Sequence, residues 1–190
     1  MPLFLLEFPG EAASREELRP LFDQVAEAAR GAGGEFIEAQ VTGDLRRVYV
    51  VVEHADEAAL TAALDASGVP SRGVAEVRLV GATLDQVKQS RGGPDYLVEW
   101  DFPAGLTMDT YLERKKAKSP LYAQVPEVSF LRTYVCEDMS KCLCFYLAQD
   151  EDAVRRAREV VSTPISRLHR LDSAPSDASP TPTAAGATGA

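Results

Sequence analysis

Residues 36–57 read FIEAQVTGDLRRVYVVVEHADE, and residues 130–151 read FLRTYVCEDMSKCLCFYLAQDE. The two segments align without a gap at a spacing of 94 residues, and both contain an apolar stretch, a turn, a second apolar stretch and an Asp-Glu pair. A repeat of this length indicates a duplicated structural unit. The same spacing pairs Leu3 with Leu97, Phe8-Pro9 with Phe102-Pro103, Leu18 with Leu112, Ala59 with Ala153 and Pro70 with Pro164.

Each copy predicts the element order βαββαβ. Apolar runs bounded by Pro, Gly and polar turns indicate strands, and apolar residues at helical spacing after a capping residue indicate helices. In the first copy we expect strands at 3–8, 36–41, 47–52 and 74–80 and helices at 14–32 and 56–64. In the second we expect strands at 97–102, 128–135, 142–147 and 167–171 and helices at 108–124 and 150–161, the former made irregular by Pro120.

The pattern divides the chain into four parts. Residues 1–80 form a first ferredoxin-like repeat, 81–95 a linker, and 96–172 a second ferredoxin-like repeat. Residues 173–190 contain mainly Ala, Ser, Thr, Pro and Gly with almost no charge, so they are predicted to be a disordered tail.

The fold class is therefore α+β. A βαββαβ unit forms a four-stranded antiparallel sheet with both helices on one face, which leaves the other face open. Apolar residues on both open faces, such as Leu5, Tyr49, Leu97 and Phe145, predict that the two sheets pack against each other as an intramolecular α/β barrel.

Composition excludes several classes of function. The 190-residue chain carries a net charge of −9, which argues against a nucleic-acid partner, because binding to phosphates needs clustered Lys and Arg. There is no uncharged apolar stretch long enough to span a membrane, and Glu7 and Pro9 interrupt the N-terminal apolar run before it resembles a signal sequence. Three cysteines fit a reducing compartment, so we expect a cytoplasmic protein. Self-association remains open.

Alternation along the strands predicts which residues face the helices and which face the other sheet. The expected helix-facing residues of the second unit are Val98, Trp100, Phe102, Leu131, Thr133 and Val135. The polar residues expected on the open faces are Glu99, Asp101, Arg132, Tyr134 and Lys141 in the second unit and Glu7, Glu38, Gln40, Arg47, Tyr49 and Glu76 in the first.

These open-face residues can form a ligand site or salt bridges that hold the sheets in register. Polar groups that converge within an apolar cavity are typical of small-molecule sites. The candidate ligand-binding residues are Glu99, Asp101, Arg132, Tyr134, Lys141, Glu7, Arg47 and Tyr49, of which Tyr134, Glu99 and Arg132 are also candidate catalytic residues.

The cysteines and histidines offer few metal ligands. Cys142 and Cys144 align with Val48 and Val50, which indicates thiols in the core rather than a metal site. Cys136 is expected near a turn as the more exposed thiol.

The two histidines are in different copies and show no recognised ligand spacing. His54 is expected at the surface before a helix, and His169 is expected to be partly buried in the last strand. His169, His54 and Cys136 are thus the weak metal candidates.

A further set of motifs carries a family resemblance. It comprises Glu99 with Phe102-Pro103-Ala104-Gly105-Leu106, then Leu131-Arg132-Thr133-Tyr134-Val135, Cys144-Phe145-Tyr146, and Asp150-Glu151-Asp152-Ala153-Val154 leading to Pro164. With these motifs, residues 96–171 resemble a small ferredoxin-like family of unknown function with nickel-binding members. The architecture also resembles dimeric α/β barrels. Members of that family commonly carry a His in the second helix and a Glu at the end of the third strand. Here those positions are Ala157 and Leu147, with Ala63 in the first copy, and the loss of such ligands weakens a nickel site.

Two functions follow. The first is a cytosolic protein that binds a small ligand between its sheets, where the resemblance implies a divalent metal such as nickel. The alternative is a cofactor-free cyclase or isomerase, or a monooxygenase-like enzyme. In such an enzyme Tyr134 or Glu99 would transfer a proton and Arg132 would stabilise negative charge.

Overall fold

The computed structural model describes residues 1–70, 73–90 and 92–172, so the predicted tail at 173–190 lies outside the described residues. The strands are β1 (Leu3–Pro9), β2 (Glu35–Val41), β3 (Arg47–Glu53), β4 (Ala75–Val80), β5 (Tyr96–Asp101), β6 (Val128–Cys136), β7 (Lys141–Ala148) and β8 (Arg167–Arg170). The α-helices are α1 (Arg19–Gly31), α2 (Glu57–Ala66), α3 (Leu84–Gln89), α4 (Met108–Lys118) and α5 (Glu151–Val160). Short 3₁₀ helices precede α1 (Arg15–Leu18) and follow α4 (Ser119–Gln124).

Equivalent residues begin the second helix of each unit. Asp56 accepts a hydrogen bond from the backbone N–H of Ala59 at 2.9 Å, and Asp150 accepts one from Ala153 at 2.7 Å. Each carboxylate satisfies a donor that would otherwise lack a partner in the first turn. The same sequence signal therefore produces the same helix start in both units.

The strands form one eight-stranded sheet in the order β2-β3-β1-β4-β6-β7-β5-β8, with antiparallel pairing throughout. The α+β fold class is thus confirmed. Each half has the ferredoxin-like order, and β4 of the first half pairs with β6 of the second through Arg78 and Val135, among others. This edge-to-edge pairing of the two sheets was not predicted from the sequence.

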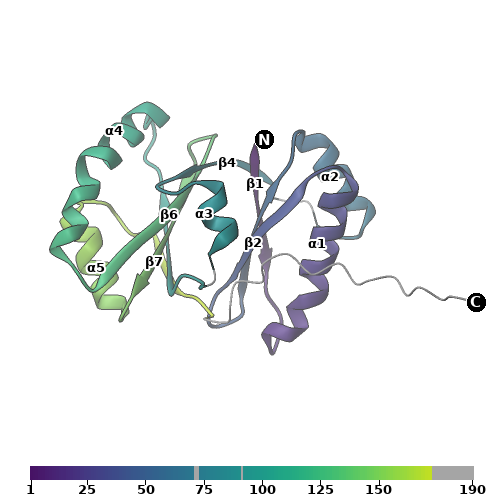
Figure 1. The fold of residues 1–190 in the computed structure, drawn as a ribbon, viewed down its shortest axis with the longest axis horizontal. Coiled ribbons are helices and arrows are strands. Elements are labelled where there is room, and N and C mark those ends of the chain that lie inside the picture. Colours follow the sequence, from purple (N-terminus) through teal and green to yellow (C-terminus); the bar gives the residue numbers. More distant parts are fainter. Residues whose placement is uncertain (71–72, 91, 173–190) are drawn as a thin grey trace, which may run out of the picture.

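The two outer strands of the sheet also meet. An isolated bridge joins Thr42 and Leu171, and the N–H of Gly43 donates to the carbonyl of Arg170 at 2.8 Å. In Figure 1 the strands lie in the middle, with α1 and α2 on one outer side and α4 and α5 on the other. The open faces of both halves therefore face one shared interior.

Three apolar clusters result. One lies under α1 and α2, a second lies under α4 and α5, and the third lies between the units, where Leu5, Tyr49, Leu97 and Phe145 are all buried. Because both open faces contribute to this third cluster, the expected packing of the two faces is observed.

The segment between the units contains a helix that the sequence did not predict. In α3, Thr83 and Gln86 form a reciprocal capping box. Val87 is buried in the cluster between the units, and Lys88 forms ion pairs with Glu35 and Glu53 of the first unit. The helix thus packs on the first unit and completes the shared core.

One orientation predicted for the second unit is wrong. Leu131 packs with the cluster between the units instead of facing the helices. A β-bulge between Phe130 and Arg132 inserts one extra residue into β6 and reverses the local alternation.

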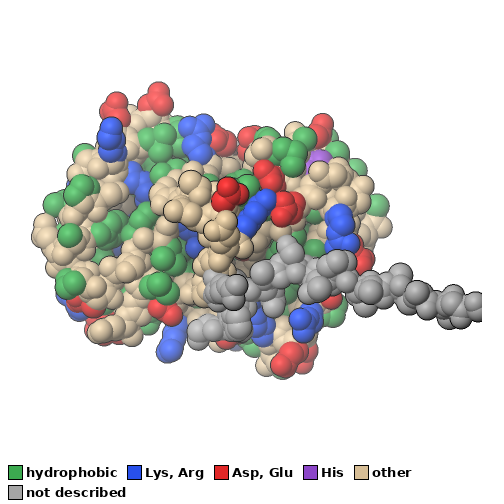
Figure 2. Space-filling model, in the orientation of Figure 1, with side chains coloured by type: hydrophobic (Ala, Val, Ile, Leu, Met, Phe, Trp, Pro, Cys, Tyr) green, Lys and Arg blue, Asp and Glu red, His purple; other side chains and the backbone are tan. Residues whose placement is uncertain are grey.

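No helix among the described residues is long and apolar enough to cross a membrane. On the face shown in Figure 2, acidic and basic side chains are interspersed.

Candidate functional site

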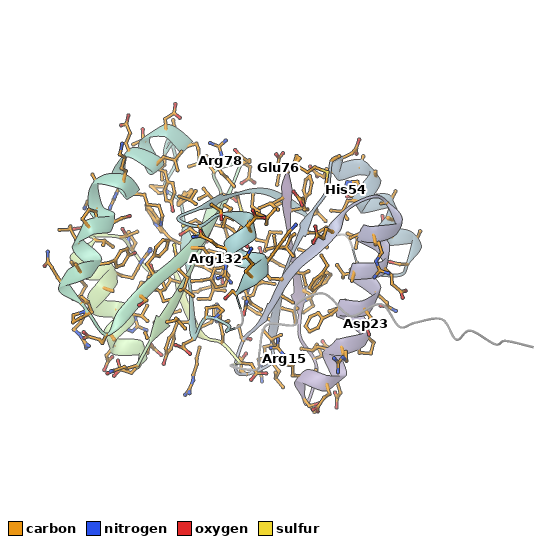
Figure 3. The ribbon with its side chains drawn as sticks, viewed as in Figure 1. Arg15, Asp23, His54, Glu76, Arg78 and Arg132 are labelled. Carbon is orange, nitrogen blue, oxygen red and sulfur yellow. The ribbon has the colours of Figure 1, made fainter. Side chains whose placement is uncertain are left out.

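Matching β-bulges place two oppositely charged residues inside the molecule. In β2 the register shifts between Phe36 and Glu38, and in β6 it shifts between Phe130 and Arg132. Glu38 and Arg132 are 94 residues apart, so they occupy equivalent positions of the two units. Figure 3 shows Arg132 in the middle of the molecule, between the units.

Glu38 and Arg132 form the centre of the first ion cluster, which we call the Glu38 cluster. The Nε of Arg132 donates to Glu38 at 2.9 Å, and its Nη2 donates to the second carboxylate oxygen. The hydroxyl of Tyr134 donates to the same carboxylate, and the Nε2 of Gln40 donates to it at 2.9 Å. All four side chains are buried.

The carboxylate of Glu38 is occupied by hydrogen bonds from within the protein. Burial, followed by the negative charge of Glu38, raises the pKa of Tyr134 well above 10, so the phenol stays protonated. Since Arg132 and Tyr134 both bind Glu38, neither has a free path to an external ligand. The arrangement joins β2 to β6 across the interior and is the register-holding alternative considered from the sequence.

A second cluster surrounds Glu99, and we call it the Glu99 cluster. Its carboxylate is fully buried and accepts hydrogen bonds from Tyr49 Oη at 3.0 Å, Lys141 Nζ at 2.9 Å and Arg167 Nε at 3.0 Å. The Nε2 of His169 lies 3.0 Å from the same carboxylate. One carboxylate therefore organises groups from strands of both units.

Two further acids extend the Glu99 cluster toward solvent. Lys141 also pairs with Glu7 at 2.7 Å, and Arg167 also pairs with Asp101 at 2.6 Å. Burial by itself would raise the pKa of Glu99. The hydrogen bonds with His169, Arg167 and Lys141 outweigh that effect and hold the pKa well below its ordinary value of 4.5.

A hollow lies beside this cluster where β2 and β8 meet. It is lined by Thr42, Gly43 and Asp44 from the turn after β2 and by residues 168–172. The side chain of His169 lines the hollow and remains 19% exposed. Within the described parts of the chain, its Nδ1 has no hydrogen-bond partner, since only Nε2 is bound. His169 thus connects a buried carboxylate with an accessible surface.

The structure brings most of the sequence-predicted site residues together, but in two groups. Glu99, Lys141, Tyr49, Glu7 and Asp101 meet in the Glu99 cluster. Arg132 and Tyr134 belong to the separate Glu38 cluster.

Two residues of the first unit do not join either cluster. The exposed side chain of Arg47 lies beside the β2–β3 turn, and Glu76 is also exposed because Val77, not Glu76, faces the interior of β4.

The expectations for His54 and Cys136 were wrong about exposure. His54 is 2% exposed: its Nε2 contacts the carbonyl of Ala32 at 2.8 Å, and its Nδ1 accepts from the N–H of Asp56 at 2.9 Å. The ring therefore fixes the chain before α2. Cys136 is 2% exposed, and burial raises the pKa of its thiol, because its side chain packs in the cluster between the units.

The roles of two residues in the clusters were missed from the sequence. Arg167 was placed in a strand but given no role, although alternation puts it on the same face as His169. Glu38 was placed on the open face but left out of the candidate site, because its partner comes from the other unit.

The residues around Glu99 do not fit a nickel ion. His169 offers one nitrogen donor, but the carboxylates of Glu99, Glu7 and Asp101 are each paired with Lys141 or Arg167, whose positive charge opposes a metal cation. The described residues contain no group of three or more His, Cys, Asp or Glu placed to hold a metal. Ala157 is buried and Leu147 is exposed at the positions where the resembling family carries ligands.

Comparison with known proteins supports the resemblance. Residues 96–171 match the family model described as "Nickel responsive protein SCO4226-like". The second unit is a match to the SCO4226-like family. The matched range runs from the start of β5 to the residue after β8, so it contains Glu99, Arg132, Tyr134, Lys141, Arg167 and His169. The resemblance inferred from the sequence is confirmed.

One solved structure shows a similar fold at low identity. A structure titled putative chlorite dismutase TA0507 is 15% identical, with 90% of this chain and 95% of that chain covered and a TM-score of 0.51. A putative monooxygenase from Fusobacterium nucleatum (FN1347) is 14% identical over 92% and 91% of the two chains, with a TM-score of 0.46. The search of curated proteins gave no match.

Proposed function

We propose that the protein binds a small polar ligand in the hollow where the two units meet, with His169 as the contact residue. The observation that carries this proposal is the placement of His169. Its Nε2 is bound to the buried carboxylate of Glu99, and its ring lines the hollow. A carboxylate that binds one ring nitrogen orients the imidazole and leaves the other nitrogen for a ligand.

The surroundings of His169 favour an organic ligand over a metal ion. Thr42, Asp44, Arg170 and Asp172 add polar groups of both charges to the hollow. Arg167 and Lys141 place positive charge directly behind the imidazole. We therefore propose ligand binding without nickel, although the second unit matches a family described as nickel responsive.

Native mass spectrometry of the purified full chain tests this proposal. We expect the wild-type protein to retain an added organic mass and the His169→Ala variant to lose it. Arg155→Ala changes an exposed ion pair on α5 and serves as the matched control, which should retain the mass. Equal retention by His169→Ala would place the ligand elsewhere.

Calorimetry with nickel chloride tests the metal alternative. We expect no saturable heat from the wild-type protein. Saturable nickel binding that disappears in His169→Ala would overturn the metal-free proposal and support a nickel site at the same residue.

The histidine–carboxylate pair also supports a second candidate function, a cofactor-free enzyme of the cyclase, isomerase or monooxygenase-like kind. In it His169 would transfer the proton, since Tyr134 and Arg132 are enclosed. Once the retained molecule is identified, its turnover by the wild type and by His169→Gln distinguishes the two functions. Conversion that is lost in the variant supports an enzyme, and binding without conversion supports a ligand-binding protein.

A further inference from the structure

A second cavity lies in the other layer of the molecule, between the sheet of the second unit and its covering helices. It lies about α4, the 3₁₀ turn Ser119–Gln124 and α5, and it is a small cavity of about 30 Å³ that opens to solvent. Three aromatic side chains line it, namely Trp100, Tyr111 and Tyr122. This layer is separate from the interior that holds the Glu38 and Glu99 clusters.

Four cationic side chains line the same cavity: Arg114, Lys115, Lys118 and Arg158. Arg158 is 3% exposed, and Lys115 and Arg114 are partly buried. Among the described residues, no carboxylate lies within ion-pair distance of any of them. Apart from the contact of Arg158 with Cys144 Sγ, their hydrogen bonds go to neutral groups such as Thr133, Tyr146 and the carbonyl of Ser162. Buried cations without a carboxylate partner are costly, so this charge requires an explanation.

Two guanidinium atoms have unused hydrogen-bonding capacity. The Nε of Arg158 and the Nε of Arg114 are buried and, within the described parts of the chain, have no hydrogen-bond partner. A buried donor without an acceptor is costly, and a bound anion would recover that cost. Arg114 also lies over the ring of Trp100, with 5.6 Å between the guanidinium carbon and the ring centroid.

The first unit shows that the fold does not need this charge. At a spacing of 94 residues, Arg158 corresponds to Leu64 and Trp100 corresponds to Leu6, both buried in an apolar core. Helices α2 and α5 begin and end at equivalent positions, so the comparison concerns the same place on the same helix.

Cys144 supplies only part of the balancing charge. The hydrogen bond with Cys142, followed by the positive charges of Arg158 and Lys115, lowers the pKa of Cys144 well below 9. Its Sγ lies 3.5 Å from Arg158 Nη1. Cys144 can supply at most one negative charge beside four cationic side chains, so an excess of positive charge remains at the cavity.

We propose that this cavity binds a small organic anion, with its carboxylate on Arg114 and Arg158 and its apolar body between the aromatic rings. The ligand class follows from the lining. Guanidinium groups match a carboxylate in geometry, and flat aromatic walls favour a small apolar body over inorganic phosphate.

The only tryptophan of the chain lines the cavity, so its fluorescence reports binding directly. The experiment titrates the full-length protein with four probes: benzoate, hexanoate, benzyl alcohol and inorganic phosphate. We expect saturable changes in Trp100 emission with benzoate or hexanoate and at least tenfold weaker responses to benzyl alcohol and phosphate.

Variants locate the site. Arg114→Gln should weaken binding of the organic anion about tenfold, the loss expected for one charge-assisted hydrogen bond. Lys116→Ala, an exposed change on the same helix, should leave affinity within twofold of wild type. Arg158→Leu introduces the residue of the first unit and should abolish binding; circular dichroism confirms that each variant is folded.

Three results would overturn the proposal. If benzyl alcohol bound as tightly as the organic anions, the site would not require a negative charge. If phosphate bound as tightly, the site would not require an apolar body. No saturable change with any probe would show that Cys144 and solvent suffice to balance the cations. None of these results bears on His169, so the proposed function stands or falls separately.

Discussion

The two units place different residues at equivalent positions. Around the Glu99 cluster, the first unit has Leu5, Arg47, Gly73 and Ala75 where the second has Glu99, Lys141, Arg167 and His169. Leu5 packs in the apolar cluster between the units, whereas Glu99 is the centre of an ion cluster.

The helix-covered faces of the two units show the same kind of difference, with an apolar residue in the first unit and a charged residue in the second. Leu64 of the first unit is part of an apolar core, and its counterpart Arg158 lines a cationic cavity. The comparison suggests that the first unit acts mainly as a packing partner and the second carries the polar chemistry. A single chain permits this division, because each copy can change independently, which identical subunits of a homodimer cannot do.

The largest expected effect comes from giving the second unit the first unit's residue at the centre of the cluster. We expect Glu99→Leu to lower the free energy of unfolding by about 3 kcal/mol, because it leaves Arg167 and Lys141 without their buried carboxylate. Urea unfolding measures the change. Asp101→Asn, at the exposed end of the same cluster, should cost less than about 1 kcal/mol. A Glu99→Leu variant as stable as wild type would show that the cluster adds no more stability than the apolar packing of the first unit.

The pH dependence of stability should reveal the same carboxylate. The pKa of Glu99 is lower in the folded protein than its ordinary value of 4.5, so below that pH the unfolded chain binds a proton that the folded chain does not. The stabilisation is present at neutral pH and is lost as the pH falls from about 4.5 downward. Urea unfolding at pH 7, 4 and 3 should therefore show a steeper loss for wild type than for Glu99→Gln. Parallel curves would contradict the assigned pKa shift.

Much of the architecture could be predicted because it depends on local sequence. The Asp56 and Asp150 caps, the strand alternation and the ungapped repeat specify helices, strands and their faces without knowledge of distant contacts. The placement of Glu99 and Trp100 on opposite faces of β5 follows from alternation and is confirmed.

The failures concern features that depend on three-dimensional neighbours. The bulge that turns Leu131 inward has no distinctive residue, and the division of the polar residues into two clusters depends on which strands face each other across the interior. Alternation placed Arg132 and Glu99 on the open face of the same unit and suggested that they share a site, whereas Arg132 pairs with Glu38 of the other unit. His54 was assigned to the surface because its structural role uses a backbone carbonyl that no side-chain pattern reveals.

The Glu38–Arg132 pair gives a sharper test of how the units cooperate. A double-mutant cycle with Glu38→Gln and Arg132→Met should give a coupling energy of about 2 kcal/mol, since both side chains are buried and bidentate. Urea unfolding of the four proteins measures it. The losses of the two single variants should add up to more than the loss of the double variant, because each single variant leaves one buried charge unpaired. Strictly additive losses would mean that the Glu38–Arg132 pair adds no net coupling between the two units.

The smallest expected effect lies on the outer surface of the contact between the units. Arg78 of β4 and Glu137, which follows β6, form a bidentate ion pair with distances of 2.8 and 3.1 Å, but both side chains are partly open to solvent. Water and salt screen such a pair, so a cycle with Arg78→Ala and Glu137→Ala should give a coupling of about 0.5 kcal/mol that decreases further in 1 M salt. The buried Glu38–Arg132 coupling should respond much less to salt, because solvent ions do not reach it. If both couplings fell equally with salt, the interior between the units would be accessible to water, and the contrast between a buried connection and a surface one would not hold.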